Sequence, residues 1–171
     1  MRLAIGEGAL CCAAMKPGVE IATWRPELRS EFERLNRPWL EGYGLLEPMD
    51  VTVLQQPEDK ILAGGGQIFF ALLGETVVGT CAAVRTADDV YELAKLGVDP
   101  SAQNRGVGRR LCEAVIALAR REGAARVVLT SNHQLTAALR LYRALGFRDA
   151  PLPADNPYET ADVYMALELA P

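Results

Sequence analysis

A short segment with two glycines, Gln-Asn-Arg-Gly-Val-Gly at residues 103–108, has the composition of an anion-binding loop. It lies between an apolar run that ends at Val98 and an amphipathic stretch that begins at Arg109. Glycines let a backbone approach a ligand closely, and the free N–H groups of a helix's first turn attract anions. The segment is therefore suited to hold a pyrophosphate. Its spacing matches neither GxGxxG nor GxxxxGK[ST], so it does not predict a dinucleotide or P-loop site.

The order of strand, Gln-x-x-Gly-x-Gly and helix resembles the acyl-CoA site of the GNAT superfamily of N-acyltransferases. Residues 91–100 resemble the central strand of that family, with Glu92 where several members place a carboxylate. Residues 131–147, which include Leu-Tyr-Arg-Ala-Leu-Gly-Phe, resemble its second signature. The two signatures occur in the right order, separated by one helix and one strand, so chance agreement is improbable. The resemblance covers roughly residues 67–149.

The resemblance implies that acetyl-CoA binds here as co-substrate, and it implies no metal. Backbone N–H groups at 105–109 would hold the pyrophosphate, and the main chain of residues 96–98 would pair with the pantetheine arm. Asn132 would cap the helix that follows it and also contact the coenzyme. The plain alternatives are a glycine turn among solvated arginines and an ordinary core strand. The predicted coenzyme-binding residues are Leu96, Gly97, Val98, Gln103, Asn104, Arg105, Gly106, Val107, Gly108, Arg109, Asn132 and Tyr142.

Two residues are predicted to be catalytic, because acetyl transfer to an amine requires one group that removes a proton and one that supplies a proton. The resemblance implies that Tyr142 protonates the departing thiolate, and a phenol with a pKa of about 10 is protonated at neutral pH. Glu92 is the first choice of base, because strand alternation places it on one face with Ala94, Leu96 and Val98, toward the acceptor. The alternatives are a tyrosine that packs a helix and a solvated or salt-bridged carboxylate. His133 is a weaker candidate, since a residue at a helix start usually faces solvent.

Hydrophobic periodicity predicts the elements that position these residues. Strands are expected over 19–24, 67–72, 76–86, 90–98, 126–130, 147–149 and 162–169, with hairpin turns at 74–75 and 88–89. Helices are expected over 26–35, 109–122 and 133–145, with a break at Pro38 and a weaker helix over 39–46 that Pro48 closes. Together with the resemblance, this order predicts an α/β (α+β) fold. Its central sheet would be mixed, mostly antiparallel, of six to seven strands flanked by helices, with a splayed central strand pair.

Composition limits the class of protein. The chain has 171 residues, of which 50% are hydrophobic, enough for one domain at 18–171 after an N-terminal extension at 1–17 that could be disordered. A formal charge of −4 disfavours nucleic acid and anionic membranes. Its cysteines, of which Cys81 and Cys112 are expected in the core, form no CxxC pair, and one histidine supplies no zinc set. Glu7 interrupts the apolar residues 3–15, which fit a signal peptide poorly, so we expect a cytoplasmic protein.

These observations predict an N-acetyltransferase that transfers the acetyl group of acetyl-CoA directly to a primary amine of a small molecule or amino acid. Acceptor contacts are expected from residues 24–49 and 151–164, with Trp39, Tyr43 and Tyr158 as candidates. One alternative is a noncatalytic acyl-CoA-binding sensor or interaction module of the same fold. Another is an acetyltransferase of a protein or of aminoacyl-tRNA. No nucleic acid or membrane partner is expected, and the resemblance leaves a homodimer open because many relatives pair.

Overall fold

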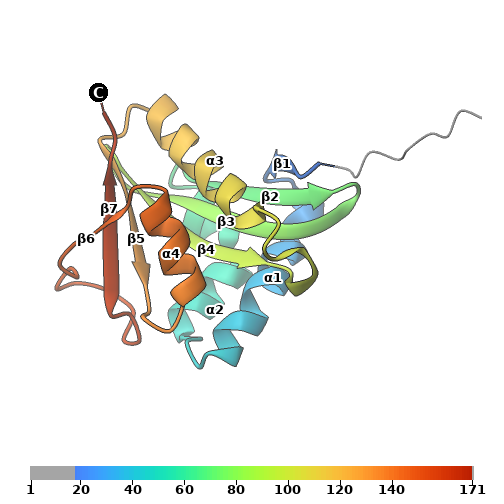
Figure 1. Cartoon of the computed structure of the whole chain (residues 1–171), viewed down its shortest axis with the longest axis horizontal. Coiled ribbons are helices and arrows are strands. Elements are labelled where there is room, and N and C mark those ends of the chain that lie inside the picture. Colours follow the sequence, from blue (N-terminus) through green and yellow to red (C-terminus); the bar gives the residue numbers. More distant parts are fainter. Residues whose placement is uncertain (1–17, 171) are drawn as a thin grey trace, which may run out of the picture.

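A computed structural model describes residues 18–170 of the chain, so the predicted extension at 1–17 lies outside the described residues. The described part is one twisted seven-stranded sheet with helices on both faces (Figure 1). Its strands are β1 (Glu20–Thr23), β2 (Gln67–Leu73), β3 (Thr76–Ala87), β4 (Val90–Val98), β5 (Arg126–Ser131), β6 (Arg148–Asp149) and β7 (Val163–Glu168). Its helices are α1 (Arg29–Gly42), α2 (Pro48–Gln55), α3 (Val107–Arg121) and α4 (Thr136–Ala144), with short helical segments η1 (Pro26–Leu28), η2 (Glu58–Leu62) and η3 (Pro100–Ala102).

The strands follow one another in the order β1-β2-β3-β4-β5-β7-β6, so β4 is the central strand, as predicted. All pairs are antiparallel except β4 and β5. That parallel pair ends at Glu92 and Val128. Beyond this point β4 continues beside β3 as far as Val98, whereas β5 continues beside β7 as far as Ser131. The two central strands therefore diverge, which confirms the predicted splayed pair.

A β-bulge interrupts β4 in its second half. Thr80 of β3 pairs with Gly97, but Ala82, two residues further along β3, pairs with Ala94. β4 therefore contains one residue more than β3 in this interval. Lys95 lies in the bulge and has a φ of 53°, in the left-handed region that residues other than glycine seldom adopt.

The bulge changes the face of the sheet toward which the following side chains point. Glu92 and Ala94 face the side of α1 and α2, where they line a pocket. Leu96 and Val98 instead pack against the hydrophobic cluster on the side of α3, and Gly97 faces α1. The prediction that Glu92, Ala94, Leu96 and Val98 share a face is therefore wrong beyond Ala94. Simple alternation cannot reveal an inserted residue, and one extra residue exchanges the two faces.

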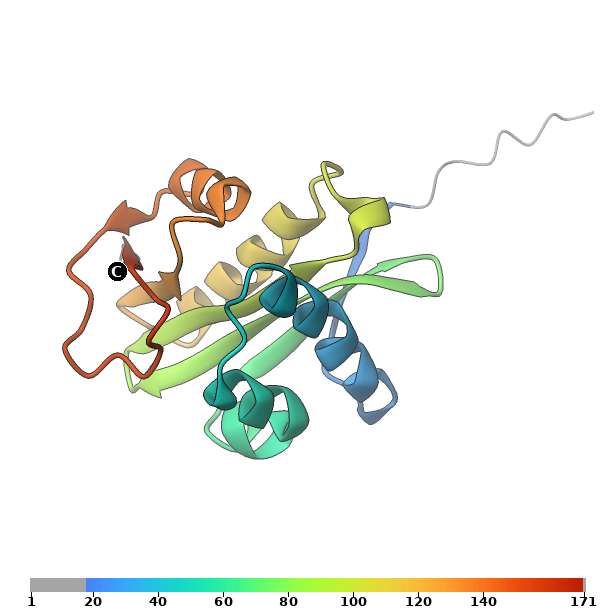
Figure 2. The same ribbon diagram turned by 90° about the horizontal axis from the view of Figure 1, so that it is seen from below.

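Two hydrophobic clusters lie on opposite faces of the sheet, beneath the helices that Figure 2 shows on each side. α3 and α4 cover one face, where Leu111 and Val115 are fully buried. The predicted core residues Cys81 and Cys112 belong to this cluster as buried free thiols. α1 and α2 cover the other face. No helix within residues 18–170 has the length and apolar character needed to cross a membrane.

The prolines at 38 and 48 do not act as the sequence predicted. α1 continues through Pro38, because Phe32, Leu35 and Leu40 are buried on both sides of it and hold the helix on the sheet. This packing outweighs the helical hydrogen bond that the proline removes. Pro48 opens α2, which the sequence did not predict, instead of closing a helix. The backbone N–H at the first position of a helix has no acceptor within the helix, so a proline there removes no helical hydrogen bond.

Candidate active site

The predicted pyrophosphate loop leads directly into α3. The helix begins at Val107, two residues before the predicted start, with Gly106 at its cap. Gly106 and Asn104 have φ values of 77° and 60°, so both occupy the left-handed region, which glycine and asparagine tolerate best. This backbone turns the chain into the helix. The N–H groups of the first turn of α3 have no acceptor within the helix. This turn, which includes Gly108 and Arg109, forms part of the wall of a cleft.

The cleft holds about 600 Å³ and lies where β4 and β5 diverge, bordered by α3 and α4. This volume is in the range of small-molecule and cofactor sites. A Cβ on Gly108 would lie 3.3 Å from Leu141 Cδ2, so the glycine keeps this part of the cleft open. Of the predicted coenzyme-binding residues, those that line the cleft are Leu96, Val98, Gln103, Asn104, Gly106, Val107, Gly108, Arg109 and Tyr142. Gly97, Arg105 and Asn132 are not among its lining residues.

Tyr142 reaches the cleft from α4 and is 7% exposed. Its ring centroid lies 6.0 Å from that of Phe147, which fixes the ring from one side. Burial raises the pKa of Tyr142 well above its usual value, and the neighbouring Cys112 and Cys81 act in the same direction. The side chain is therefore a neutral phenol at neutral pH, able to donate its proton.

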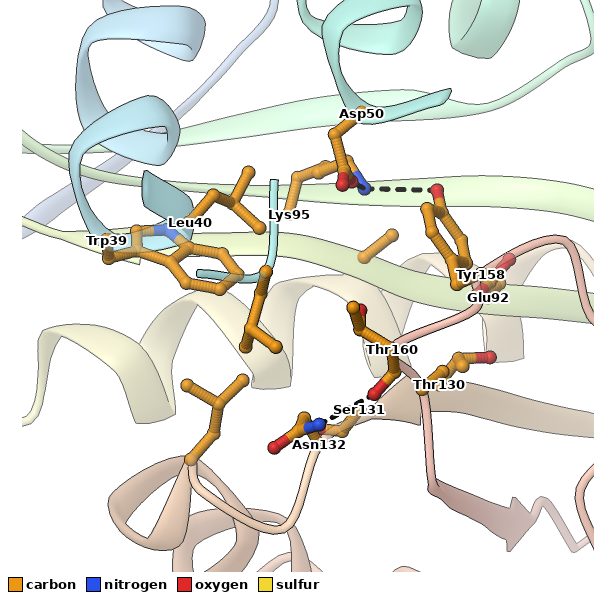
Figure 3. A pocket seen from close by; sticks show the side chains of 14 residues that line it. Trp39, Leu40, Asp50, Glu92, Lys95, Thr130, Ser131, Asn132, Tyr158 and Thr160 are labelled. Carbon is orange, nitrogen blue, oxygen red and sulfur yellow. Dashed lines mark hydrogen bonds and ion pairs between the residues drawn. The ribbon is translucent and has the colours of Figure 1, made fainter. Parts of the chain in front are cut away.

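A smaller pocket of about 90 Å³ adjoins the cleft (Figure 3). Its walls come from α1, α2, β4, the end of β5 and the segment before β7. The residues that line both spaces are Trp39, Ala94, Lys95, Thr130, Ser131 and Leu135. Those that line the small pocket alone are Leu40, Leu45, Asp50, Glu92, Asn132, Tyr158, Thr160 and Ala161. Among the candidate acceptor residues, Trp39 and Tyr158 therefore meet here, whereas Tyr43 borders the larger cleft.

Glu92 lines the small pocket, on the face of β4 opposite Leu96. Burial raises the pKa of its carboxyl group, while Lys95 and a hydrogen bond from Thr130 partly oppose the shift. A carboxyl with a raised pKa is a stronger base once it is ionised. The group thus has the position and the basicity to take a proton from an amine that enters the pocket.

A buried ion pair closes the same pocket, and the sequence analysis missed it. Lys95 Nζ lies 2.6 Å from Asp50 Oδ1 and 3.1 Å from the Tyr158 hydroxyl (Figure 3). The side chains of Lys95 and Asp50 are 9% and 3% exposed. Burial lowers the pKa of Lys95, but Tyr158 and Asp50 outweigh that effect, so the pKa is raised and the ammonium stays charged. The signal in the sequence was a second charged residue, a lysine, in a strand that is otherwise apolar apart from Glu92.

Glu47, at the cap of α2, fastens the segment that leads into β7. Its carboxylate accepts hydrogen bonds from the backbone N–H groups of Glu159 and Thr160 at 3.0 and 2.8 Å, and from the Thr160 hydroxyl at 2.6 Å. Burial raises the pKa of Glu47, but the bonds from Thr160 and Glu159 outweigh it, so the pKa is lowered. The segment forms one wall of the small pocket because these bonds hold it against α2.

Asn132 is not the N-cap of α4, contrary to the prediction. The helix begins at Thr136 after Leu135, and Asn132 Oδ1 accepts instead from the backbone N–H of Gln134 at 2.9 Å, within a turn before the helix. Its Nδ2 donates to the Thr160 carbonyl at 2.6 Å, so it supports the same wall (Figure 3). This contact joins residues 28 apart in the chain.

His133 lines neither space, and its side chain is exposed. It pairs with Asp162, whose pKa is lowered chiefly by that contact. The pair links the turn after β5 to the start of β7. Within residues 18–170 no group of three His, Cys, Asp or Glu side chains could hold a metal ion.

Comparison with known proteins identifies the family. A model of the acetyltransferase (GNAT) family matches residues 26–147. The chain belongs to this family. The prediction of an acyltransferase family with this fold is thereby confirmed. A GNAT acetyltransferase structure from Staphylococcus aureus Mu50 has a TM-score of 0.80 at 20% identity, covering 90% of this chain and 100% of that one. A putative acetyltransferase from Salmonella typhimurium, solved with acetyl-CoA, has a TM-score of 0.72 at 20% identity, covering 89% and 94%.

Curated relatives of this GNAT chain match shorter regions. The N-alpha-acetyltransferase RimI of Mycobacterium tuberculosis is 44% identical over 64 residues, which are 37% of this chain and 39% of that protein. The ribosomal protein bS18 alanine N-acetyltransferase of Escherichia coli K12 is 34% identical over 87 residues, which are 48% of this chain and 58% of that protein. The chain thus spans less than two thirds of the length of either relative.

Proposed function

We propose that this GNAT protein transfers the acetyl group of acetyl-CoA directly to a primary amine. The observation that carries the proposal is the pair of adjoining spaces, one with a phenol and one with a carboxylate. Tyr142 lines the cleft and Glu92 lines the small pocket, and the two spaces share Ala94 and Lys95 as part of their common wall. Two substrates held in these spaces would meet at that wall, between a proton donor and a proton acceptor.

The cleft suits the coenzyme. Acetyl-CoA supplies the acetyl group as a thioester. The N–H groups around Gly106 and Gly108, with the dipole of α3 behind them, would hold its pyrophosphate, and Arg109 adds positive charge. The edge of β4 that β5 leaves after Glu92 offers main-chain groups to the pantetheine arm.

The small pocket suits the acceptor. An alkylammonium that enters must lose a proton, and Glu92 would take it, directly or through water. The amine nitrogen then forms a bond with the thioester carbonyl carbon while the carbon–sulfur bond breaks. The sulfur leaves with the bonding electrons and takes the phenolic proton of Tyr142. The nitrogen gives up its second proton as the amide forms, and this proton restores the Tyr142 phenol, directly or through water. The products are the acetylated amine and coenzyme A with a free thiol.

The size of the small pocket limits the class of acceptor. A volume of about 90 Å³ admits the amine end of a small molecule or of an amino acid residue. A second candidate, the α-amine of a protein, is supported by the names of the two curated relatives. The free thiols of Cys81 and Cys112 fit action in a reducing compartment such as the cytoplasm.

Calorimetric titration with acetyl-CoA tests the proposal first. We expect saturable binding that Gly108→Glu weakens strongly, because the added carboxylate would lie in the cleft. Gly64→Glu is the matched control, because Gly64 is exposed and lines neither space. A Cβ atom added there would lie 3.8 Å from the nearest atom. Release of free thiol with a panel of amines then measures turnover. No binding by the folded protein would overturn the proposal, and binding without turnover would support the noncatalytic alternative.

A further inference from the structure

The small pocket carries three formal charges, and their arrangement limits the amines that it can accept. Glu92 and Asp50 each carry a negative charge when ionised, and Lys95 carries one positive charge. The sum is −1, which suits a cation. An acceptor amine approaches as an ammonium and is attracted, whereas a carboxylate on the same molecule meets a negative field.

Lys95 is not free to bind such a carboxylate. Its ammonium is held by Asp50 at 2.6 Å and by Tyr158 at 3.1 Å, with little exposure to solvent. An opposite charge at this distance cancels most of the attraction that the ammonium would exert on a second anion. A substrate carboxylate would have to displace Asp50, which would leave a buried carboxylate without its partner.

Asp50 is also fixed from its other side. Its Oδ2 accepts a hydrogen bond from the backbone N–H of Glu47 at 2.9 Å, so both carboxylate oxygens are occupied. The same Glu47 holds Thr160 through its own carboxylate. Asp50 therefore cannot turn away from Lys95 without opening the cap of α2 and loosening the wall of the pocket.

The other polar groups of the pocket are neutral. Thr130, Ser131 and Thr160 contribute hydroxyl groups, and Asn132 contributes an amide. Hydroxyl groups donate hydrogen bonds to a carbonyl oxygen without requiring charge. The Thr160 hydroxyl already donates to Glu47 and the Asn132 amide to the Thr160 carbonyl, so the pocket offers the Glu92 carboxylate for an amine and the Ser131 hydroxyl for an uncharged neighbouring group.

We infer that the acceptor is a primary amine without a free carboxylate beside it, either an alkylamine or the α-amine of an amide or peptide, and that the Asp50–Lys95 pair excludes free amino acids. This inference rests on the proposed function and narrows its acceptor. Asp50 is a specificity-determining residue, because it neutralises the one cation of the pocket that a substrate carboxylate could use.

The test compares amino acid amides with the matched free amino acids, alaninamide with alanine and glycinamide with glycine, and adds propylamine. Rates of thiol release are recorded over a range of pH and compared at the plateau of each profile, so that the different basicities of the amines do not decide the ratio. We expect wild-type kcat/KM to favour the amides and propylamine over the free acids by about tenfold or more, the scale of one unpaired charge near a protein surface. This comparison requires no variant to fold.

Two variants test the role of the ion pair. Asp50→Asn frees the ammonium of Lys95, so we expect the preference for amides to fall by about tenfold. Lys95→Met removes the cation, so the preference should stay or grow. Because the two changes damage the same contact but move the ratio differently, a general loss of structure cannot explain the result. Thermal melting and acetyl-CoA affinity serve as controls for folding.

The outcomes separate the inference from the proposed function. Equal use of amides and free acids by the wild-type protein, or a ratio that Asp50→Asn leaves unchanged, would overturn the inference and leave acetyl transfer standing. Acetyl-CoA binding with no turnover of any amine in the panel would overturn both.

Discussion

Gly97 of β4 lies against the backbone of Leu35 in α1. A Cβ atom on Gly97 would be 2.5 Å from the carbonyl oxygen of Leu35 and 3.3 Å from Asn36 Oδ1. Asn36 is itself fully buried and bonded to Phe32 and Trp39, so it cannot move aside. The absence of a side chain at Gly97 thus sets how closely α1 approaches the central strand.

Gly97→Ala should therefore displace α1 from β4. Trp39, on the same helix, lines both spaces, so we expect weaker acceptor binding as well as a loss of about 1–3 kcal/mol in the free energy of unfolding. Denaturant titration and KM for the acceptor measure the two effects. Gly42→Ala is the matched control. A Cβ there meets no atom within 4 Å, and alanine has a higher helix propensity than glycine. Full stability of Gly97→Ala would contradict the close contact.

Glu92→Gln should remove the acidic limb of the pH–rate profile. Burial raises the pKa of Glu92 above its usual 4.5, so the wild-type base becomes ionised, and kcat/KM rises, only as the pH passes that raised value. Glutamine cannot take a proton, and we expect kcat to fall by about 10²–10⁴. Acetyl-CoA affinity is the control, since Glu92 does not line the cleft. A profile with the same acidic limb in the variant would assign the limb to another group.

Tyr142→Phe should lower kcat far more than acetyl-CoA affinity. The substitution keeps the ring beside Phe147 and removes only the hydroxyl, which we propose protonates the thiolate. We expect a loss of about 10²–10⁴ in kcat. Single-turnover rates and calorimetry measure the two quantities separately. A parallel loss of turnover and affinity would indicate a packing role for the tyrosine, as the alternative interpretation of the sequence holds.

Glu47→Gln should raise KM for the acceptor by roughly tenfold, because the charged hydrogen bonds to Glu159 and Thr160 weaken and the wall of the pocket loosens. The pKa of Glu47 is lowered in the folded protein, so its contribution to stability is complete above about pH 4.5. It is lost as the pH falls through the folded-state pKa. The stability difference between wild type and variant should therefore shrink on acidification, as urea titrations at several pH values would show.

The sequence predicted the central strand, the glycine loop and the order of elements, because each is encoded locally. Gly106 and Gly108 mark the turn into α3 by their residue type alone. The ion pair of Lys95 and Asp50 joins residues 45 apart, and only the folded chain brings them together. α2 was missed because proline ends one helix and begins another with equal ease, and the packing around the proline decides which.

Because of the bulge at Lys95, the two halves of β4 present their side chains to different spaces. Before the bulge, Glu92 points into the small pocket that we propose for the acceptor, and after it, Leu96 and Val98 line the cleft that we propose for the coenzyme. A substitution of Glu92 should therefore act on the amine and its proton while leaving the lining of the cleft as it is. Deletion of one residue at the bulge would shift the register of β4 and exchange the faces toward which the side chains of its second half point. In the function that we propose, one strand thus presents different side chains to the two substrates, and those that line only one space can be redesigned separately.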